Sequence, residues 1–202
     1  MPQKYKKYIP IIAIILLALG VNLDRFGIDL QQLAGQGSSN TSASNSASGS
    51  GAGNSGTTGN RADVASLPHW SSTSPKINQW HVFQGEINRK GKPVGFHSRP
   101  GGQDPANARV VRVKSGPNRA GVYTASIEIR DGQQWKEKFS SFFPDDMDVS
   151  AVNSAIVHAF KNSKDPKRQP WSGPSGLGFE IQGYTASRGD INTAFPVFVQ
   201  GQ

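Results

Sequence analysis

Apolar and polar residues alternate most regularly from Val122 to Arg130, in the stretch VYTASIEIR. A period of two residues is typical of a β-strand that buries one face. The dipeptide Asp131-Gly132 follows directly and favours a hairpin turn. We therefore expect the next apolar stretch, from Trp135 to Phe139, to return as a paired antiparallel strand.

Shorter apolar runs predict further strands. Three of them are Val110–Val113, Phe179–Tyr184 and Ile191–Val199. The stretch Trp80–Arg99 contains two more, separated by the charged, glycine-containing run Arg89–Lys92, which is typical of a turn. The segment between the expected helix and the last two strands is rich in glycine and proline and predicts an irregular loop that contains Trp171.

One segment has a helical period instead. From Val149 to Lys161, apolar side chains recur at the spacing of a single helix face. This stripe consists of Val149, Val152, Ile156, Ala159 and Phe160. Asp145, Asp146 and Asp148 precede the helix, where carboxylates cap free N–H groups and suit the helix dipole. Strands before and after a central helix predict an α+β fold of antiparallel β-sheets.

Composition divides the 202-residue chain into parts. The segment Ala34–Asn60 has no charge, no aromatic residue and no aliphatic side chain larger than alanine. Such a segment cannot bury enough apolar surface to offset its ordering entropy, so it predicts a flexible coil. We therefore expect a targeting segment at residues 1–23, a flexible linker at 24–60 and a single domain at 61–202.

The expected targeting segment begins with Lys4, Lys6 and Lys7, followed by an uncharged apolar run from Tyr8 to Leu23. This run is shorter than the roughly 20 residues of a typical spanning helix and suits the apolar region of a signal peptide. Cleavage by a signal peptidase and retention as a membrane anchor both remain open. Either outcome predicts an exported domain, secreted or held at the membrane.

The net charge is +8 and the chain contains no cysteine. A basic exported domain favours polyanionic partners such as nucleic acid, anionic lipid headgroups or acidic polysaccharide. The absence of cysteine excludes disulfides, thiolate catalysis and cysteine–zinc sites.

Two of the four histidines, His81 and His97, flank the expected turn in the stretch Trp80–Arg99. If the two short strands pair, both imidazoles face one cleft, with Lys90, Lys92 and Arg99 nearby. Two imidazoles that titrate near pH ~6.5 can exchange protons with a substrate at neutral pH. The other two histidines fit structural or solvated positions: His69 beside a proline, and His158 opposite the apolar stripe of the helix.

Four segments in order, HVFQGEIN, GFHSR, KFSSFFPD and INTAFP, resemble the bacterial branch of the EndoU family of endoribonucleases. The similarity covers roughly Trp80–Phe198. It implies an EndoU-like nuclease core and cleavage of RNA, with a preference for uridine and 2′,3′-cyclic phosphate ends. It also implies that no cofactor is required, although some members of the family respond to manganese. If the protein serves as a toxin, any immunity or inhibitor protein is encoded elsewhere.

In this family, two histidines and a lysine are catalytic, whereas a serine and a Thr-x-Tyr-Pro segment hold the uracil. The matching positions are His81 and His97, Lys138 or Lys136, Ser140 or Ser141, Thr193 and, in place of the usual tyrosine, Phe195. A phenyl ring still stacks on a base, which is worth about 1–3 kcal/mol, but the tyrosine hydroxyl is missing. The departure therefore puts the uridine preference in more doubt than the cleavage itself.

The expected chemistry suits these residue types. RNA carries its own nucleophile, the 2′-OH, so one histidine can remove that proton while the other protonates the departing 5′-oxygen. We assign His97 provisionally as base and His81 as acid, with Lys138 stabilising charge on the phosphorane.

Two alternatives belong to other functional classes. A non-catalytic polyanion-binding module would account for the charge, the linker and Trp171, but it leaves the paired histidines and Thr193 unexplained. A metal-dependent nuclease would use the aspartates ahead of the helix, although acids clustered at one helix start fit capping better.

Overall fold

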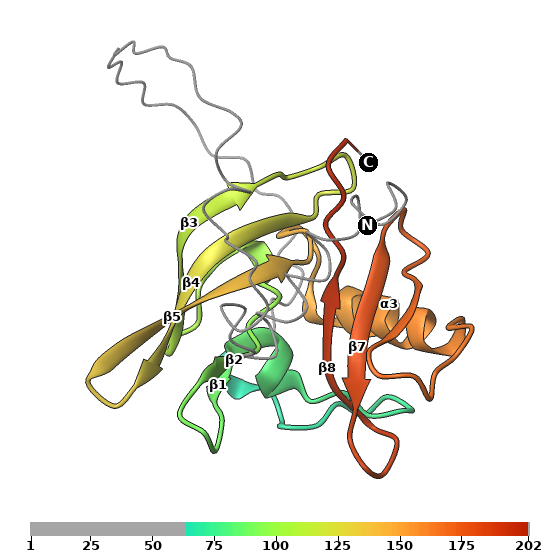
Figure 1. Ribbon diagram of the computed structural model, residues 1–202, viewed down its shortest axis with the longest axis horizontal. Helices are drawn as coiled ribbons and strands as arrows, with labels where there is room; N and C mark the ends of the chain where they lie inside the picture. Colours follow the sequence, from blue (N-terminus) through green and yellow to red (C-terminus); the bar gives the residue numbers. More distant parts are fainter. Residues whose placement is uncertain (1–63, 202) are drawn as a thin grey trace, which may run out of the picture.

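The structure is a computed structural model that describes residues 64–201. Within them the fold is α+β, as predicted, with three small antiparallel sheets and one main helix (Figure 1). The elements are η3 (Val64–Ser66), η4 (Trp80–Gln84), β1 (Glu86–Ile87), β2 (Pro93–Val94), η5 (Pro100–Gly102), β3 (Ala108–Ser115), β4 (Tyr123–Asp131), β5 (Gln134–Phe142), α3 (Val149–Lys161), β6 (Trp171–Pro174), β7 (Glu180–Thr185) and β8 (Ile191–Pro196).

Strands β3, β4 and β5 form one sheet in that order. The predicted hairpin is confirmed, because β4 and β5 pair antiparallel from Tyr123 opposite Phe142 to Asp131 opposite Gln134. One face of this sheet buries a small apolar core around Ile127. The core consists of Phe96, Ala108, Tyr123, Ala125, Ile127, Ile129 and Phe142.

Helix α3 has the bounds predicted from its periodicity, Val149–Lys161. Asp148 caps it, because its side chain accepts a hydrogen bond from the backbone N–H of Ala151, as the capping interpretation expected. In the predicted stripe Val152, Ile156 and Ala159 are buried, whereas Val149 and Phe160 are only partly buried.

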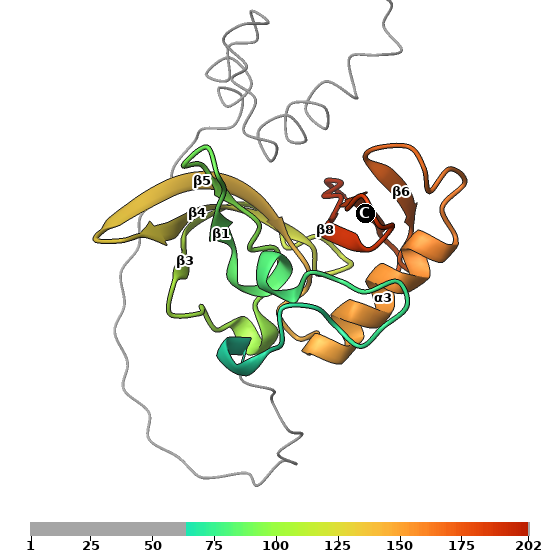
Figure 2. The same ribbon diagram turned by 90° about the horizontal axis from the view of Figure 1, so that it is seen from below.

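The second large sheet has the order β6-β7-β8 and packs on α3. The sheet and the helix together enclose the larger apolar core. Figure 2 shows α3 beside this sheet and the β3–β5 sheet on the other side of the molecule. Strand β8 ends at Pro196, earlier than the predicted Val199. Proline lacks the backbone N–H that a central ladder position requires, which fits this end.

The prediction of an irregular loop around Trp171 was wrong. Strand β6 begins at Trp171 and pairs with β7, and the indole is fully buried in the larger core. It meets Phe160 of α3 edge to face, with 5.2 Å between the ring centroids. Trp171 is therefore a packing residue and not the surface aromatic that the polyanion-binding alternative used.

The β1–β2 hairpin forms around the predicted turn, but each strand has only two residues. Both histidines lie outside the strands, since His81 is in the π-helical turn η4 and His97 follows β2. The hairpin contacts β4 and β5, whereas η4, which contains His81, contacts β8, so the histidine segments lie where the two large sheets meet.

The predicted segments 1–23 and 24–60, and the start of the predicted domain 61–202, lie outside the described residues. Among residues 64–201, no helix combines the length and the apolar character that crossing a bilayer requires.

Candidate functional site

A cavity of about 370 Å³ lies where the histidine segments meet the β7–β8 strands. Its lining residues are His81, Glu86, Asn88, Val94, His97, Tyr184, Asn192, Thr193 and Phe195. The cavity thus brings together four residues predicted from the sequence: His81, His97, Thr193 and Phe195.

Backbone hydrogen bonds hold the two histidine segments against each other. The N–H of Phe96 donates to the carbonyl of His81 at 2.8 Å, and the N–H of His97 donates to the carbonyl of Val82 at 2.7 Å. Gly95 permits this approach, because a Cβ there would lie 2.2 Å from the His81 carbonyl oxygen and because its φ is +77°. The imidazole centroids are consequently 6.3 Å apart.

His81 is backed by a carboxylate. Its Nδ1 lies 2.8 Å from Oε1 of Glu86. An ionised carboxylate only accepts, so this nitrogen carries a proton. The hydrogen bond from His81 lowers the pKa of Glu86, which keeps the carboxylate charged and able to stabilise a positive imidazole.

His97 has a different environment. It is 3% exposed, and its Nδ1 lies 3.1 Å from the carbonyl oxygen of Ser141. A carbonyl only accepts, so Nδ1 is the protonated nitrogen and the lone pair is left on Nε2. Burial, together with the nearby charges of Lys138 and His81, holds the pKa of His97 well below 6.5. The folded protein therefore favours a neutral imidazole at this position.

Lys138 lies behind His97, on strand β5. Its Nζ donates to the carbonyl of Gly95 at 2.9 Å and lies 3.3 Å from the hydroxyl of Ser140. Burial lowers the pKa of Lys138 to about 7. Lys136 points instead to the hairpin turn, where its amine donates to Gly91 at 2.8 Å and pairs with Asp131. Of the two lysines that the sequence left open, Lys138 is thus the one beside the histidines.

Ser140 and Ser141 are both buried and neither lines the cavity. The hydroxyl of Ser140 donates to the carbonyl of Phe96 at 2.7 Å and lies 3.0 Å from Nδ1 of His97. Ser141 meets the same ring through its backbone carbonyl. In this structure both serines therefore contact the catalytic candidates from behind.

Thr193 and Phe195 reach the cavity from strand β8. The ring of Phe195 lies 5.4 Å from the imidazole of His97, centroid to centroid. Thr193 is 9% exposed and its hydroxyl has no hydrogen-bond partner among the described residues. Strand β8 therefore presents an aromatic face and an unpartnered hydroxyl to the cavity.

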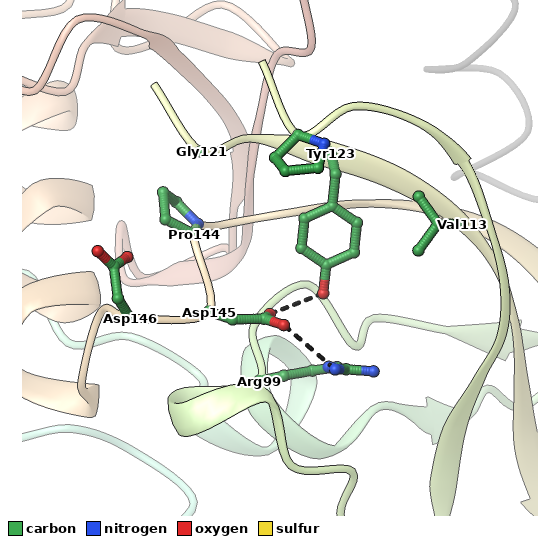
Figure 3. Close-up of a pocket in the computed structure, with 8 residues that line it drawn as sticks. Arg99, Val113, Gly121, Tyr123, Pro144, Asp145 and Asp146 are labelled. Atoms are coloured by element: carbon green, nitrogen blue, oxygen red, sulfur yellow. Dashed lines mark hydrogen bonds and ion pairs between the residues drawn. The ribbon is translucent and has the colours of Figure 1, made fainter. Parts of the chain in front are cut away.

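Arg99 was expected near the histidines but lines a separate cavity of about 330 Å³ (Figure 3). Its guanidinium binds Asp145 at 3.1 Å and Asp104 at 3.2 Å, and Asp145 also accepts from the hydroxyl of Tyr123 at 2.7 Å. Lys90 and Lys92 are exposed and lie outside the histidine cavity as well.

Of the aspartates ahead of α3, Asp145 thus belongs to an arginine–tyrosine cluster and Asp148 caps the helix, whereas Asp146 is exposed beside the same cavity as Arg99. Within residues 64–201, no group of three or more histidines and carboxylates is arranged to hold a metal ion.

The remaining histidines lie where the sequence placed them. His158 is exposed on α3. His69 is also exposed and stacks between Trp70 and Trp80, with centroid distances of 5.4 Å and 4.7 Å. This stacking gives His69 a structural role.

Sequence reasoning missed Glu86 and Tyr184. Glu86 lies inside the quoted segment HVFQGEIN, but a carboxylate five residues after a histidine has no recognisable spacing in a strand or an α-helix. The π-helical turn and the glycine that follows it bring the two side chains together. Tyr184 reaches the cavity only because β7 pairs with β8, which places it beside Thr193.

Known proteins resemble the chain over the same region. A sequence model of the family described as bacterial EndoU nuclease matches residues 76–197. A curated Bacillus cereus protein named "Toxin" is 28% identical over 142 residues, which cover 68% of this chain and 25% of that protein. The chain therefore spans about a quarter of the length of this curated relative. No solved structure matches the chain.

Proposed function

The chain belongs to the bacterial EndoU nuclease family, and from this we propose that it is an RNA endonuclease that prefers uridine and leaves 2′,3′-cyclic phosphate ends. One observation carries the proposal: two histidines in different environments line the same cavity, one beside a carboxylate and one buried next to a lysine. A carboxylate beside His81 favours its protonated form, as an acid requires, and burial lowers the pKa of His97 and favours the neutral form that a base requires.

His97 is the base in this proposal. Its neutral ring keeps a lone pair on Nε2, because Nδ1 donates to the Ser141 carbonyl. A neutral imidazole can take the proton of the 2′-OH, after which the oxygen attacks the adjacent phosphorus and forms the cyclic phosphate. RNA therefore supplies the nucleophile, and the protein supplies proton transfer and charge stabilisation.

His81 is the acid. The ionised Glu86 stabilises a protonated His81, which then gives its proton to the departing 5′-oxygen. After one turnover the proton taken by His97 must be lost and His81 must be recharged. Exchange with solvent accomplishes both, and no external reagent is consumed.

Lys138 stabilises the negative charge that develops on the phosphorane. Preorganised cations usually make large contributions to such steps because they need no reorganisation during the reaction. With a pKa of about 7, Lys138 is partly protonated at neutral pH, so its charge and the catalytic rate depend on pH. Ser140 positions this group, because its hydroxyl contacts both Lys138 and His97.

The base that precedes the scissile phosphate lies against Phe195 and meets Thr193 in this proposal. An aromatic ring provides stacking, and the unpartnered threonine hydroxyl can donate to or accept from a base edge. This hydroxyl contributes to the uridine preference, since stacking alone is shared by every base.

The experiment is to incubate the purified protein with a mixed-sequence RNA and to identify the sequence and chemistry of the new ends. We expect cuts after uridine with cyclic phosphate termini. A matched substrate with 2′-deoxyuridine at the cleavage site should resist, because the nucleophile is absent. Activity should also survive excess chelator, with manganese acting only as a modulator. Cleavage of the deoxy substrate at a similar rate would exclude this mechanism.

The name of the Bacillus cereus relative suggests the setting. We propose that the protein acts as a toxin whose producer carries an immunity protein that blocks the nuclease. Residues 1–23 would direct export, as a signal peptide or as an anchor, and residues 24–60 would tether the domain. Export of a fusion of residues 1–60 to a reporter tests this part separately from the nuclease activity.

A further inference from the structure

Strands β7 and β8 share a face that turns toward the histidine cavity. Tyr184 pairs with Thr193 and Gln182 pairs with Phe195 across the two strands. Because side chains alternate along a strand and paired residues project to the same side, these four side chains lie on one face. The opposite face buries Ile181 and Ala194 in the larger core, which also contains the buried residues of α3.

This face has an unusual concentration of unsatisfied polar atoms. The hydroxyls of Tyr184 and Thr193 and the side-chain carbonyl of Gln182 are buried and have no hydrogen-bond partner among the described residues. Buried polar groups in folded proteins are nearly always paired, so three unpaired neighbours require an explanation. Gln182 does not line the cavity, whereas Tyr184 and Thr193 both do.

The Phe195 ring at the end of this face has no polar atom of its own. The resemblance to the EndoU family leads one to expect a tyrosine there, and the missing hydroxyl weakens the case for base recognition. Tyr184 is a second aromatic residue on the same face, one strand over, and it has an unpartnered hydroxyl.

We propose that Tyr184 determines base specificity: its hydroxyl donates to the uracil oxygen at the position where cytosine has an amino group. This inference rests on the proposed RNA endonuclease function. Uracil offers an acceptor at this position and cytosine a donor, so a hydroxyl donor there favours uridine. Thr193, the cross-strand partner of Tyr184, meets the base beside it.

The chemistry of the phenol agrees with a donor role. Burial raises the pKa of Tyr184 above its ordinary value, so the hydroxyl keeps its proton throughout the pH range in which the enzyme works. A protonated phenol beside an aromatic stacking residue provides a directional contact that stacking on Phe195 lacks.

The test compares the unmutated protein with Tyr184→Phe on two DNA oligonucleotides that carry a single ribonucleotide, either uridine or cytidine. Each substrate then has one cleavable bond, and kcat/KM can be measured for each base separately. We expect Tyr184→Phe to lower cleavage at uridine by roughly tenfold while cleavage at cytidine changes little, because one hydrogen bond to the base is lost.

Tyr123→Phe is the matched control. It removes another tyrosine hydroxyl, one that binds Asp145 outside the cavity, and it should leave the ratio of uridine to cytidine cleavage unchanged. A substrate-side measurement is independent of folding: 4-thiouridine, whose sulfur is a weak acceptor, should slow the unmutated protein but should not slow Tyr184→Phe further.

The outcomes distinguish a failure of the role of Tyr184 from a failure of the proposed nuclease function. If the unmutated protein cleaves at uridine and Tyr184→Phe lowers the ratio of uridine to cytidine cleavage, the inference holds. If Tyr184→Phe lowers cleavage at both bases equally, or leaves both unchanged, Tyr184 has no role in specificity although the nuclease function stands. If the unmutated protein cleaves neither ribonucleotide substrate nor mixed RNA, the proposed function itself is wrong, and the role of Tyr184 is rejected with it.

Discussion

Two sides of the histidine site differ in how their polar atoms are paired: the β5 side, which lies behind His97, and the β7–β8 wall of the cavity. On the β5 side, Lys138, Ser140 and His97 bind one another or neighbouring backbone carbonyls. On the β7–β8 wall, the hydroxyls of Tyr184 and Thr193 have no partner among the described residues.

This difference matches the two tasks that the cavity combines. Catalytic groups act best when their protonation and orientation are fixed before the substrate arrives, so their hydrogen bonds are made inside the protein. A recognition surface instead makes its hydrogen bonds to the ligand, and an analogue that leaves them unmade is rejected. Under the proposed function, the β5 side is therefore the catalytic side, and the β7–β8 wall is the recognition wall.

The largest effect should come from the catalytic histidines. His81→Ala and His97→Ala should each reduce cleavage by roughly 10²-fold or more, because alanine cannot transfer a proton. Binding of an uncleavable RNA should fall far less, since most affinity comes from lysine and arginine contacts to phosphate. Gel-shift and single-turnover assays separate the two quantities. His158→Ala is the matched control on the exposed face of α3, and full activity in either cavity variant would refute the mechanism.

Lys138→Met should follow with a loss of roughly 10²-fold in kcat and a smaller change in KM, because its charge acts mainly on the transition state. Lys136→Met is the control on the same strand, since that amine binds the hairpin turn. Equal losses in the two variants would show that general basic charge, and not the position of Lys138, supports cleavage.

The pH dependence should follow from the environments of His97 and Lys138. Because the pKa of His97 is held well below 6.5, the base stays neutral down to acidic pH. Lys138 loses its proton as the pH rises through about 7, so the rate should then fall by roughly tenfold per pH unit. Profiles of kcat/KM for the unmutated protein and for Lys138→Arg test this, because arginine stays charged. An alkaline limb that persists unchanged in Lys138→Arg would assign that limb to another group.

Among these predictions, Thr193→Val should have the smallest effect on cleavage, and it should change only the contacts that the recognition wall makes with the base. It replaces the unpartnered hydroxyl with a methyl group of similar size, and cleavage at uridine should fall by up to about tenfold. Cleavage of an oligonucleotide with a single cytidine should change less. The ratio of the two kcat/KM values is the measurement, and an unchanged ratio would show that Thr193 takes no part in the selection of uridine.

Local patterns predicted much of the fold. The β4–β5 hairpin, the bounds of α3 and the cap at Asp148 all depend on neighbouring residues, so periodicity and capping chemistry were sufficient to find them. Trp171 was misplaced because a proline- and glycine-rich context resembles a loop. Its burial depends on contact with α3 and β7, which no local pattern records.

Sequence alone determined the family to which the chain belongs, and it gave the two candidate histidines and the candidate stacking residue, because these depend on residue identity and order. Sequence could not choose between Lys136 and Lys138, since side chains that are two residues apart on a strand project to the same face. Only the tertiary structure shows which lysine lies beside His97, because the amine of Lys138 binds the carbonyl of Gly95 and that of Lys136 binds the carbonyl of Gly91. Tertiary structure was likewise needed to find Glu86 and Tyr184. The π-helical turn brings Glu86 to His81, and the register of β7 and β8 places Tyr184 beside Thr193.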